Sequence, residues 1–185
     1  MKPLLRMTLA AMFLALGMIL PYFTGQIQVI GSMLLPMHIP VILCGFICGW
    51  KYGLAVGIVL PLLRSVTLGM PPLFPMALGM AIELGVYGFV SGWLYSHSKY
   101  QCVWALYKCL IAAMIAGRLA YGLYMTIVMM ALGQPYSLQI FLTSTIVNGL
   151  PGIVLQLVLI PAVMVLLNRT GLVRFSKASR AAEKA

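Results

Sequence analysis

The sequence predicts an all-α integral membrane protein, a bundle of about six transmembrane helices with both ends of the chain in the cytoplasm. Three observations lead to this fold class. Of the 185 residues, 63% are hydrophobic and 8% are charged, whereas a soluble domain carries about 25% charged residues. The mean hydropathy is +1.06, and the apolar segments approach the ~20 residues that a helix needs to cross a bilayer. Most Lys and Arg residues lie in alternate connections between these segments.

The first three predicted spans are Leu4–Tyr22, His38–Trp50 and Tyr52–Leu68. The first is an apolar run that follows Lys2 and contains Arg6 near its start. The second is shorter than a full crossing requires, so we expect it to begin within the preceding loop. The third ends at the turn "GMPPLFP", because glycine and proline interrupt a helix.

The last three predicted spans are Leu73–Tyr95, Val103–Leu132 and Leu138–Leu167. The fourth starts inside the proline-rich turn and ends at a polar connection. The fifth and sixth are longer than a bilayer needs, which predicts tilted helices or ends that project into water. In the sixth, Pro151 predicts a kink because proline lacks the N–H that a helix uses. Residues 1–185 are expected to form one domain, with a basic tail from about 169 to 185.

The basic residues outside the spans predict the orientation of the chain. Loops 23–37, 69–72 and 133–137 contain no Lys or Arg. The alternate connections and the two ends hold Lys2, Arg6, Lys51, Lys99, Lys108, Arg169, Arg174, Lys177, Arg180 and Lys184. Cytoplasmic segments of membrane proteins carry such an excess, so both termini are expected in the cytoplasm. The net charge of +10 is therefore explained by a lipid bilayer as the partner, and no nucleic acid is predicted.

Three charged residues remain inside the predicted spans: Arg64, Glu83 and Arg118. A charge near the bilayer centre costs roughly 3 kcal/mol, so we expect Glu83 to pair with one arginine, either of the two. The surplus positive charge has two interpretations. It completes a buried ion triad that fixes helix register, or it faces a cavity and binds an anionic or strongly polar ligand, for which the planar fork of arginine is suited.

The surroundings of these charges favour a ligand cavity. Helical spacing puts Met76, Met80 and Tyr87 on the face of Glu83, and Tyr121, Met125 and Met129 on the face of Arg118. Such a mixture suits an organic ligand with polar groups at one end, although Met and Tyr also fill bundle cores. Ser144 and Asn148 add polar groups, and His38 is interpreted equally well as a ligand contact at the mouth of the cavity or as a cap or loop hydrogen bond. Loop 23–37, with Gln26, Gln28 and Ser32, is expected to close over the ligand. The predicted substrate-binding residues are Arg118, Glu83, Arg64, His38, Tyr87, Tyr121, Asn148, Met80, Met125 and Gln28.

Enzyme chemistry is not predicted. Glu83 and Glu183 are the two acidic residues of the chain, and Glu183 lies in the tail, so a paired-carboxylate mechanism is excluded. The sequence has no nucleotide-binding P-loop and no zinc spacing. The four cysteines, Cys44, Cys48, Cys102 and Cys109, are interpreted as small buried hydrophobes. We therefore predict no catalytic residue, metal or cofactor.

Small residues recur at four-residue spacing on several spans. Ala11 and Ala15 form such a step on the first span, and Gly-x-x-x-Gly steps follow at Gly53–Gly57 and Gly88–Gly92. These steps let helices approach closely. The glycine pairs are explained equally well by packing within the bundle or by another contact. The alanine step also suits a partner membrane protein.

These features together resemble a known family. Six spans, two internal termini, the Ala11–Ala15 step and a long outer loop before "LLPMHIPVILCGFICGWKYGLAVGIVLPLLRS" resemble the S component of an energy-coupling factor (ECF) vitamin transporter. The resemblance covers almost the whole chain. It implies a subunit in the plasma membrane of a prokaryote that captures a vitamin or vitamin precursor, with a T component and two cytoplasmic ATPases as partners. Ala11 and Ala15 would contact the T component. The surplus positive charge favours an acidic vitamin, such as one with a pantothenate-like carboxylate.

Two other classes remain open from the sequence. A self-sufficient secondary transporter would use Glu83 as a proton-coupling acid, but we find no inverted repeats. A membrane assembly or signalling protein without a small ligand would use the charged residues only for structure.

Overall fold

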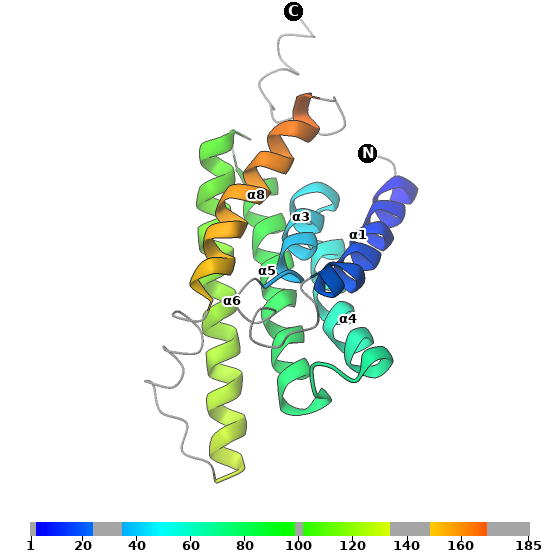
Figure 1. Cartoon of the computed structure of the whole chain (residues 1–185). Helices are drawn as coiled ribbons and strands as arrows, with labels where there is room; N and C mark the ends of the chain where they lie inside the picture. Colours follow the sequence, from blue (N-terminus) through cyan, green and yellow to red (C-terminus); the bar gives the residue numbers. More distant parts are fainter. Residues whose placement is uncertain (1–2, 24–34, 99–101, 134–148, 170–185) are drawn as a thin grey trace, which may run out of the picture.

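A computed structural model describes residues 3–23, 35–98, 102–133 and 149–169 of the chain. In these ranges the regular secondary structure is helical (Figure 1). The helices, in chain order, are α1 (Pro3–Phe23), α3 (His38–Cys48), α4 (Trp50–Leu68), the π-helical turn η1 (Leu73–Ala77), α5 (Leu78–His97), α6 (Val103–Ala131) and α8 (Leu150–Arg169). Five helical stretches are long and apolar enough to cross a membrane, with η1 and α5 acting as one of them. The predicted all-α membrane class is therefore confirmed.

The predicted spans agree closely with these helices in most places. The first, third, fourth and fifth spans differ from α1, α4, η1–α5 and α6 by at most two residues at either end. The second span corresponds to α3, which is too short to cross a bilayer. The expected start within the preceding loop is not seen in the described residues, because 35–37 form a turn, and the helix ends at Cys48 because Gly49 adopts a positive φ before α4 begins at Trp50. Of the sixth span, residues 138–148 lie outside the described ranges. Pro151 stands in the first turn of α8, where its missing N–H is tolerated. The kink predicted there concerns the chain before residue 149, which lies outside the described ranges, so it stays a prediction.

Helix α5 is the centre of the bundle. It packs against α3, α4 and α6, while α1 covers α3 and α4, and α8 contacts α6 and α3. The starts of α1 and α6, the α3–α4 connection and the end of α8 lie at one end of the bundle, and the end of α6 lies at the other (Figure 1). The exposed basic residues Arg6, Lys51, Lys108 and Arg169 are found near the first end. The basic residues at the ends of the described helices thus share one side of the structure.

Glycines allow α3, α4 and α5 to touch through their backbones. A Cβ atom added to Gly53 on α4 would lie 2.6 Å from the carbonyl oxygen of Gly88 on α5. One added to Gly92 would lie 2.7 Å from the carbonyl oxygen of Gly45 on α3, and one on Gly57 would collide with the backbone of Leu84. The sequence-predicted glycine steps therefore pack within the bundle. We call the contact of Gly45, Gly53, Gly57, Gly88 and Gly92 the glycine seam.

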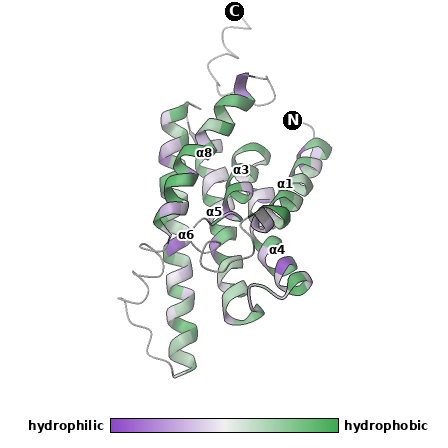
Figure 2. Cartoon of the chain, viewed as in Figure 1, coloured by the Kyte–Doolittle hydropathy of each residue, from purple (hydrophilic) through white to green (hydrophobic). Residues whose placement is uncertain are grey.

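The outside of the bundle is apolar. Leu4, Val66, Trp104, Leu119 and Met130 expose 63–78% of their surface, and hydrophobic residues dominate the outer helices in Figure 2. Soluble proteins rarely expose apolar side chains over so large a continuous surface. The described surface is therefore suited to lipid.

The glycine seam generates the first prediction. Gly88→Ala should lower the stability of the purified protein by about 1–3 kcal/mol, the usual cost of overpacking, because its Cβ would overlap the backbone of Gly53. Gly85→Ala is the matched control one turn away on α5. Its Cβ would meet side-chain atoms of Ile58 at 3.1 Å, which can move, and alanine favours the helix. Unfolding in detergent measures both; equal stability of the two variants would contradict the seam.

Candidate functional site

An ion pair between α5 and α6 forms the centre of the candidate site. Glu83 on α5 is 3% exposed, and its Oε1 is 3.0 Å from Nη1 of Arg118 on α6, whose side chain is 17% exposed. The two helices approach closely here because residue 117 is glycine. A Cβ there would lie 3.1 Å from the carbonyl oxygen of Glu83 and 2.9 Å from the ring of Tyr87. The structure therefore identifies Arg118 as the arginine that pairs with Glu83.

A third helix adds His38 to this pair. His38 is the first residue of α3, is 1% exposed, and holds its Nε2 3.6 Å from Oε1 of Glu83. That separation is too long for a hydrogen bond. The His38 ring meets the Tyr87 ring edge-on, with centroids 5.1 Å apart and planes at 77°. Four predicted site residues, which we call the Arg118 cluster, thus come together from three helices: His38, Glu83, Tyr87 and Arg118.

The Arg118 cluster has more hydrogen-bonding groups than partners. Within the described part of the chain, Nε and Nη2 of Arg118 and both ring nitrogens of His38 are buried and have no hydrogen-bond partner. Buried polar atoms in folded proteins are nearly always paired, and each exception calls for an explanation. Nε and Nη2 share one edge of the planar guanidinium, the edge that receives two oxygens of a carboxylate or phosphate in parallel bonds. Glu83 forms an ion pair with Nη1, and the Tyr87 hydroxyl interacts with both Glu83 and Arg118, while Nε and Nη2 keep no hydrogen-bond partner in the described structure.

Arg64 does not join the cluster. It lies on α4, donates from Nη1 to the backbone carbonyl of Met18 at 3.3 Å, and places its guanidinium carbon 5.9 Å from the centre of the Tyr22 ring. Both partners belong to α1. No ion pair joins Arg64 to Glu83 among the residues that the structure describes. The structure thus gives Arg64 a role in holding α1 against α4, and its predicted contact with substrate has no support from this geometry.

Of the remaining predicted residues, Met76 is 47% exposed and so does not face the interior, and Met129 is half-buried. The others fall into two groups. Met125 is buried, and Met80 and Tyr121 are half-buried on the helices that carry Glu83 and Arg118. A Cβ on Gly79 would lie 2.9 Å from the Tyr121 ring and 3.0 Å from that of Tyr124, so this glycine makes room for both tyrosines. The second group lies outside the described ranges and comprises Gln26, Gln28, Ser32, Ser144 and Asn148.

Gln156 is a buried polar residue that a search for charges in the sequence overlooks. It lies on α8, is 1% exposed, and neither atom of its amide has a hydrogen-bond partner in the described ranges. The signal in the sequence is a single amide within the apolar run "GIVLQLVLIP". Burying an amide at membrane depth without a hydrogen-bond partner costs free energy. Gln156 is therefore an additional candidate for polar contact in the interior.

The fold and the cluster define a helical membrane protein with a polar site enclosed by α3, α5 and α6. A family profile described as "ECF transporter, substrate-specific component" matches residues 5–164 of the chain. The match covers most of the chain, including every helix that contributes to the Arg118 cluster. This chain therefore belongs to the family of substrate-specific components of ECF transporters. No curated protein and no solved structure matches it.

The ion pair generates the second prediction. Glu83→Ala should destabilise the protein by about 3 kcal/mol, because removing one partner leaves a buried charge unpaired. In an Arg118→Ala background the same substitution should cost much less, since the uncompensated cation is then absent. A double-mutant cycle on detergent unfolding measures the coupling. Additive effects of the two substitutions would show that the 3.0 Å contact contributes nothing to stability.

Proposed function

We propose that this chain captures a small vitamin or vitamin precursor that bears a carboxylate, with Arg118 as its anchor. Membership of the substrate-specific family supports a ligand-binding role. The observation that carries the finer proposal is the open edge of Arg118, where Nε and Nη2 are buried without a partner in the described structure. A carboxylate has two oxygens at the spacing that this edge recognises.

The charge balance at the cluster refines this proposal. Arg64 contacts α1, so its positive charge does not add to that of Arg118. Glu83 neutralises Arg118, and the pair carries no net charge as a unit. The preference for a carboxylate therefore rests on the geometry of two aligned N–H donors and on the neighbouring His38, and no longer on a surplus cation. Glu83 in turn holds the guanidinium in the orientation that presents its free edge.

The wider setting of the proposal follows from the family and the charge pattern. We infer that both termini are cytoplasmic, because exposed basic residues gather at one end of the helices. Loop 23–37 would then face the outer side, and Gln28 and Asn148, which lie outside the described ranges, remain proposed ligand contacts. The membrane is the plasma membrane of a prokaryote.

A separate module supplies the energy in this proposal. The sequence shows no nucleotide-binding P-loop. We propose that the chain associates with a membrane T component and with two cytoplasmic ATPases, and that the ATPases hydrolyse the ATP. Ala11 and Ala15 are exposed on α1, while Ala10 and Phe13 face the bundle. A surface of small residues allows another membrane helix to approach closely. This exposure supports α1 as the contact with the T component.

The third prediction tests the anchor. Mass spectrometry of small molecules that co-purify with the protein identifies the ligand, and calorimetric titration then gives its Kd. Arg118→Ala should weaken binding by about 1.5–3 kcal/mol, the value of a hydrogen bond to a charged group, and Arg118→Lys should restore only part of it because lysine lacks the fork. An analogue in which an amide replaces the ligand's carboxylate should bind the unchanged protein more weakly by a similar amount. Arg118→Ala should not weaken the binding of this analogue further.

Arg64→Ala is the matched control for this titration. It removes a buried arginine that contacts α1, so the folded protein should bind with unchanged affinity even if its stability falls. If Arg118→Ala behaves in the same way, with lower stability and unchanged Kd, Arg118 is a structural residue and the proposed anchor is wrong.

The fourth prediction tests the partner surface. Replacing Ala11 and Ala15 together by Trp should abolish co-purification with the T component and ATP-dependent uptake, because the large rings prevent close helix contact. Ligand binding by the isolated chain should persist. Leu16→Trp is the control and should leave uptake intact, because Leu16 is 40% exposed but is neither three nor four residues from Ala11 or Ala15 and therefore points to another side of α1. Normal uptake by the double variant would exclude this face of α1 as the contact.

A further inference from the structure

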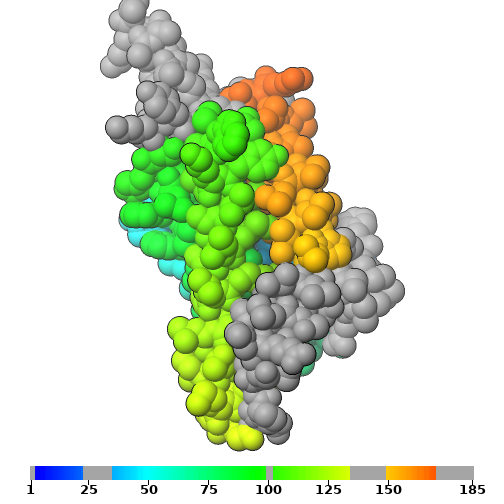
Figure 3. Space-filling model, turned by 90° about the vertical axis from the view of Figure 1, so that its left-hand side faces the viewer, coloured from blue at the N-terminus to red at the C-terminus, as the bar shows by residue number. Residues whose placement is uncertain are grey.

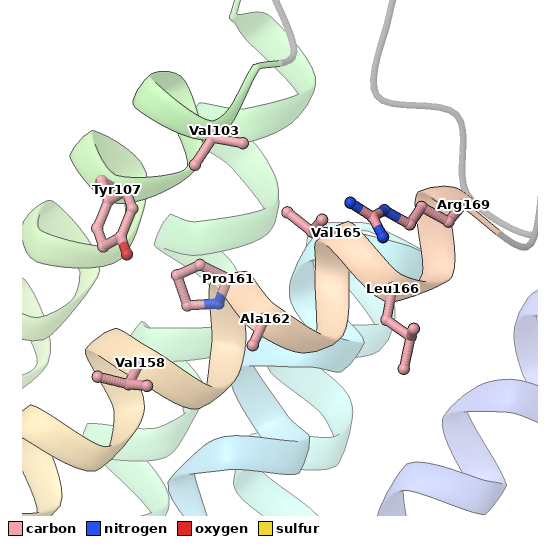
Figure 4. A pocket seen from close by; sticks show the side chains of 8 residues that line it. All are labelled: Val103, Tyr107, Val158, Pro161, Ala162, Val165, Leu166 and Arg169. Atoms are coloured by element: carbon pink, nitrogen blue, oxygen red, sulfur yellow. The ribbon is translucent and has the colours of Figure 1, made fainter.

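A groove separates the outer faces of α6 and α8, away from the Arg118 cluster. Its volume is about 500 Å³, and it shares no lining residue with the cluster. Val103 and Tyr107 line it from α6, and Val158, Ala162 and Arg169 are among its residues on α8 (Figure 4). The two helices lie side by side on the face of the protein seen in Figure 3. Ala162 has a small side chain, which leaves the groove open between its larger neighbours.

The groove is polar at one end and apolar along the rest. Arg169 is the charged residue of the lining, and Tyr107 supplies a hydroxyl; the other lining residues are aliphatic. Arg169 is the last residue of α8 and Val103 is the first of α6, so the charged end coincides with the ends of two membrane-spanning helices. The side chain of Arg169 extends from α8 over Val165 toward the α6 side (Figure 4).

The length of the groove matches one leaflet of a bilayer. From Val158 to Arg169 the axis of α8 rises by about 16 Å at 1.5 Å per residue. Half of a ~30 Å hydrocarbon core is about 15 Å. A molecule that fills the groove is therefore apolar over the depth of one leaflet and negatively charged at the water boundary. Tyr107 lies about one turn further in than Val103, at a depth of ~6 Å, where a second polar group of the molecule would be reached.

We propose that this groove binds one anionic phospholipid. An acyl chain lies along Val158 and Ala162, the phosphate of the headgroup contacts Arg169, and the Tyr107 hydroxyl donates to an ester carbonyl. Arginine is suited to this role because its fork binds two phosphate oxygens. Because the groove lies on the outer faces of two membrane-spanning helices, it is in contact with the bilayer, and a lipid can enter it directly. This site is independent of the proposed substrate and of its anchor at Arg118.

The experiment compares lipids with identical acyl chains and different headgroups. The full chain in detergent is titrated with phosphatidylglycerol and with phosphatidylcholine, and native mass spectrometry counts the lipids retained. Phosphatidylglycerol should bind about fivefold more tightly, the contribution of one basic residue to an anionic lipid. Arg169→Gln should reduce its affinity to that of phosphatidylcholine. Lys108→Gln, which removes an exposed lysine of α6 outside the lining, should leave the preference unchanged.

Two further arms separate lipid from other occupants. Ala162→Trp fills the groove and should weaken the binding of both lipids. Val154→Trp, at an exposed position of α8 outside the lining, should leave the binding of both unchanged. Inorganic phosphate should give no thermal stabilisation. The proposal fails if Arg169→Gln keeps the headgroup preference, or if phosphate alone stabilises as much as the lipid. It also fails if the Ala162→Trp variant binds lipid normally but no longer co-purifies with the T component, because a protein partner then covers the groove.

Discussion

The contact between Glu83 and Arg118 is the interaction on which the arrangement of the bundle interior depends. A carboxylate at membrane depth is costly without a counter-charge, and here the counter-charge comes from the neighbouring helix at 3.0 Å. The contact fixes how far α6 is shifted along α5, and Gly117 supplies the space that this shift requires. His38, the first residue of α3, lies beside the pair, with its Nε2 3.6 Å from Oε1 of Glu83. The ion pair thus joins α5 to α6 and leaves Nε and Nη2 of the guanidinium without a partner in the described structure.

The sequence was a good guide to features that depend on one helix at a time. Apolar length determines the spans, so Leu4–Tyr22 was predicted almost as α1 (Pro3–Phe23) is found. Features that depend on the rotation of one helix against another were harder to predict. Arg64 and Arg118 look equivalent along the chain, but α4 turns Arg64 toward α1 while α6 turns Arg118 toward Glu83. Gln156 was missed because its burial results from the packing of α8 on its neighbours, which no pattern within the helix reveals.

The family and the geometry contribute different parts of the functional picture. The match over residues 5–164 assigns the chain to substrate-specific components of ECF transporters but says nothing of which molecule is bound. The unpaired Nε and Nη2 of Arg118, beside His38, Glu83 and Tyr87, support the proposal of a ligand with two acceptor oxygens. Both parts are needed, because the same helical scaffold serves a different molecule when a few side chains at the centre change.

The glycine seam has a mechanical consequence. Where α3, α4 and α5 meet through glycine, backbone lies against backbone, and there are no side-chain rotamers that could rearrange to absorb a small displacement. Close-packed contacts of this kind transmit strain rather than relax it. The three helices are therefore expected to behave as one stiff body. A conformational change in the bundle is therefore expected to occur at the packing contacts with α1, α6 and α8, where longer side chains can change rotamer.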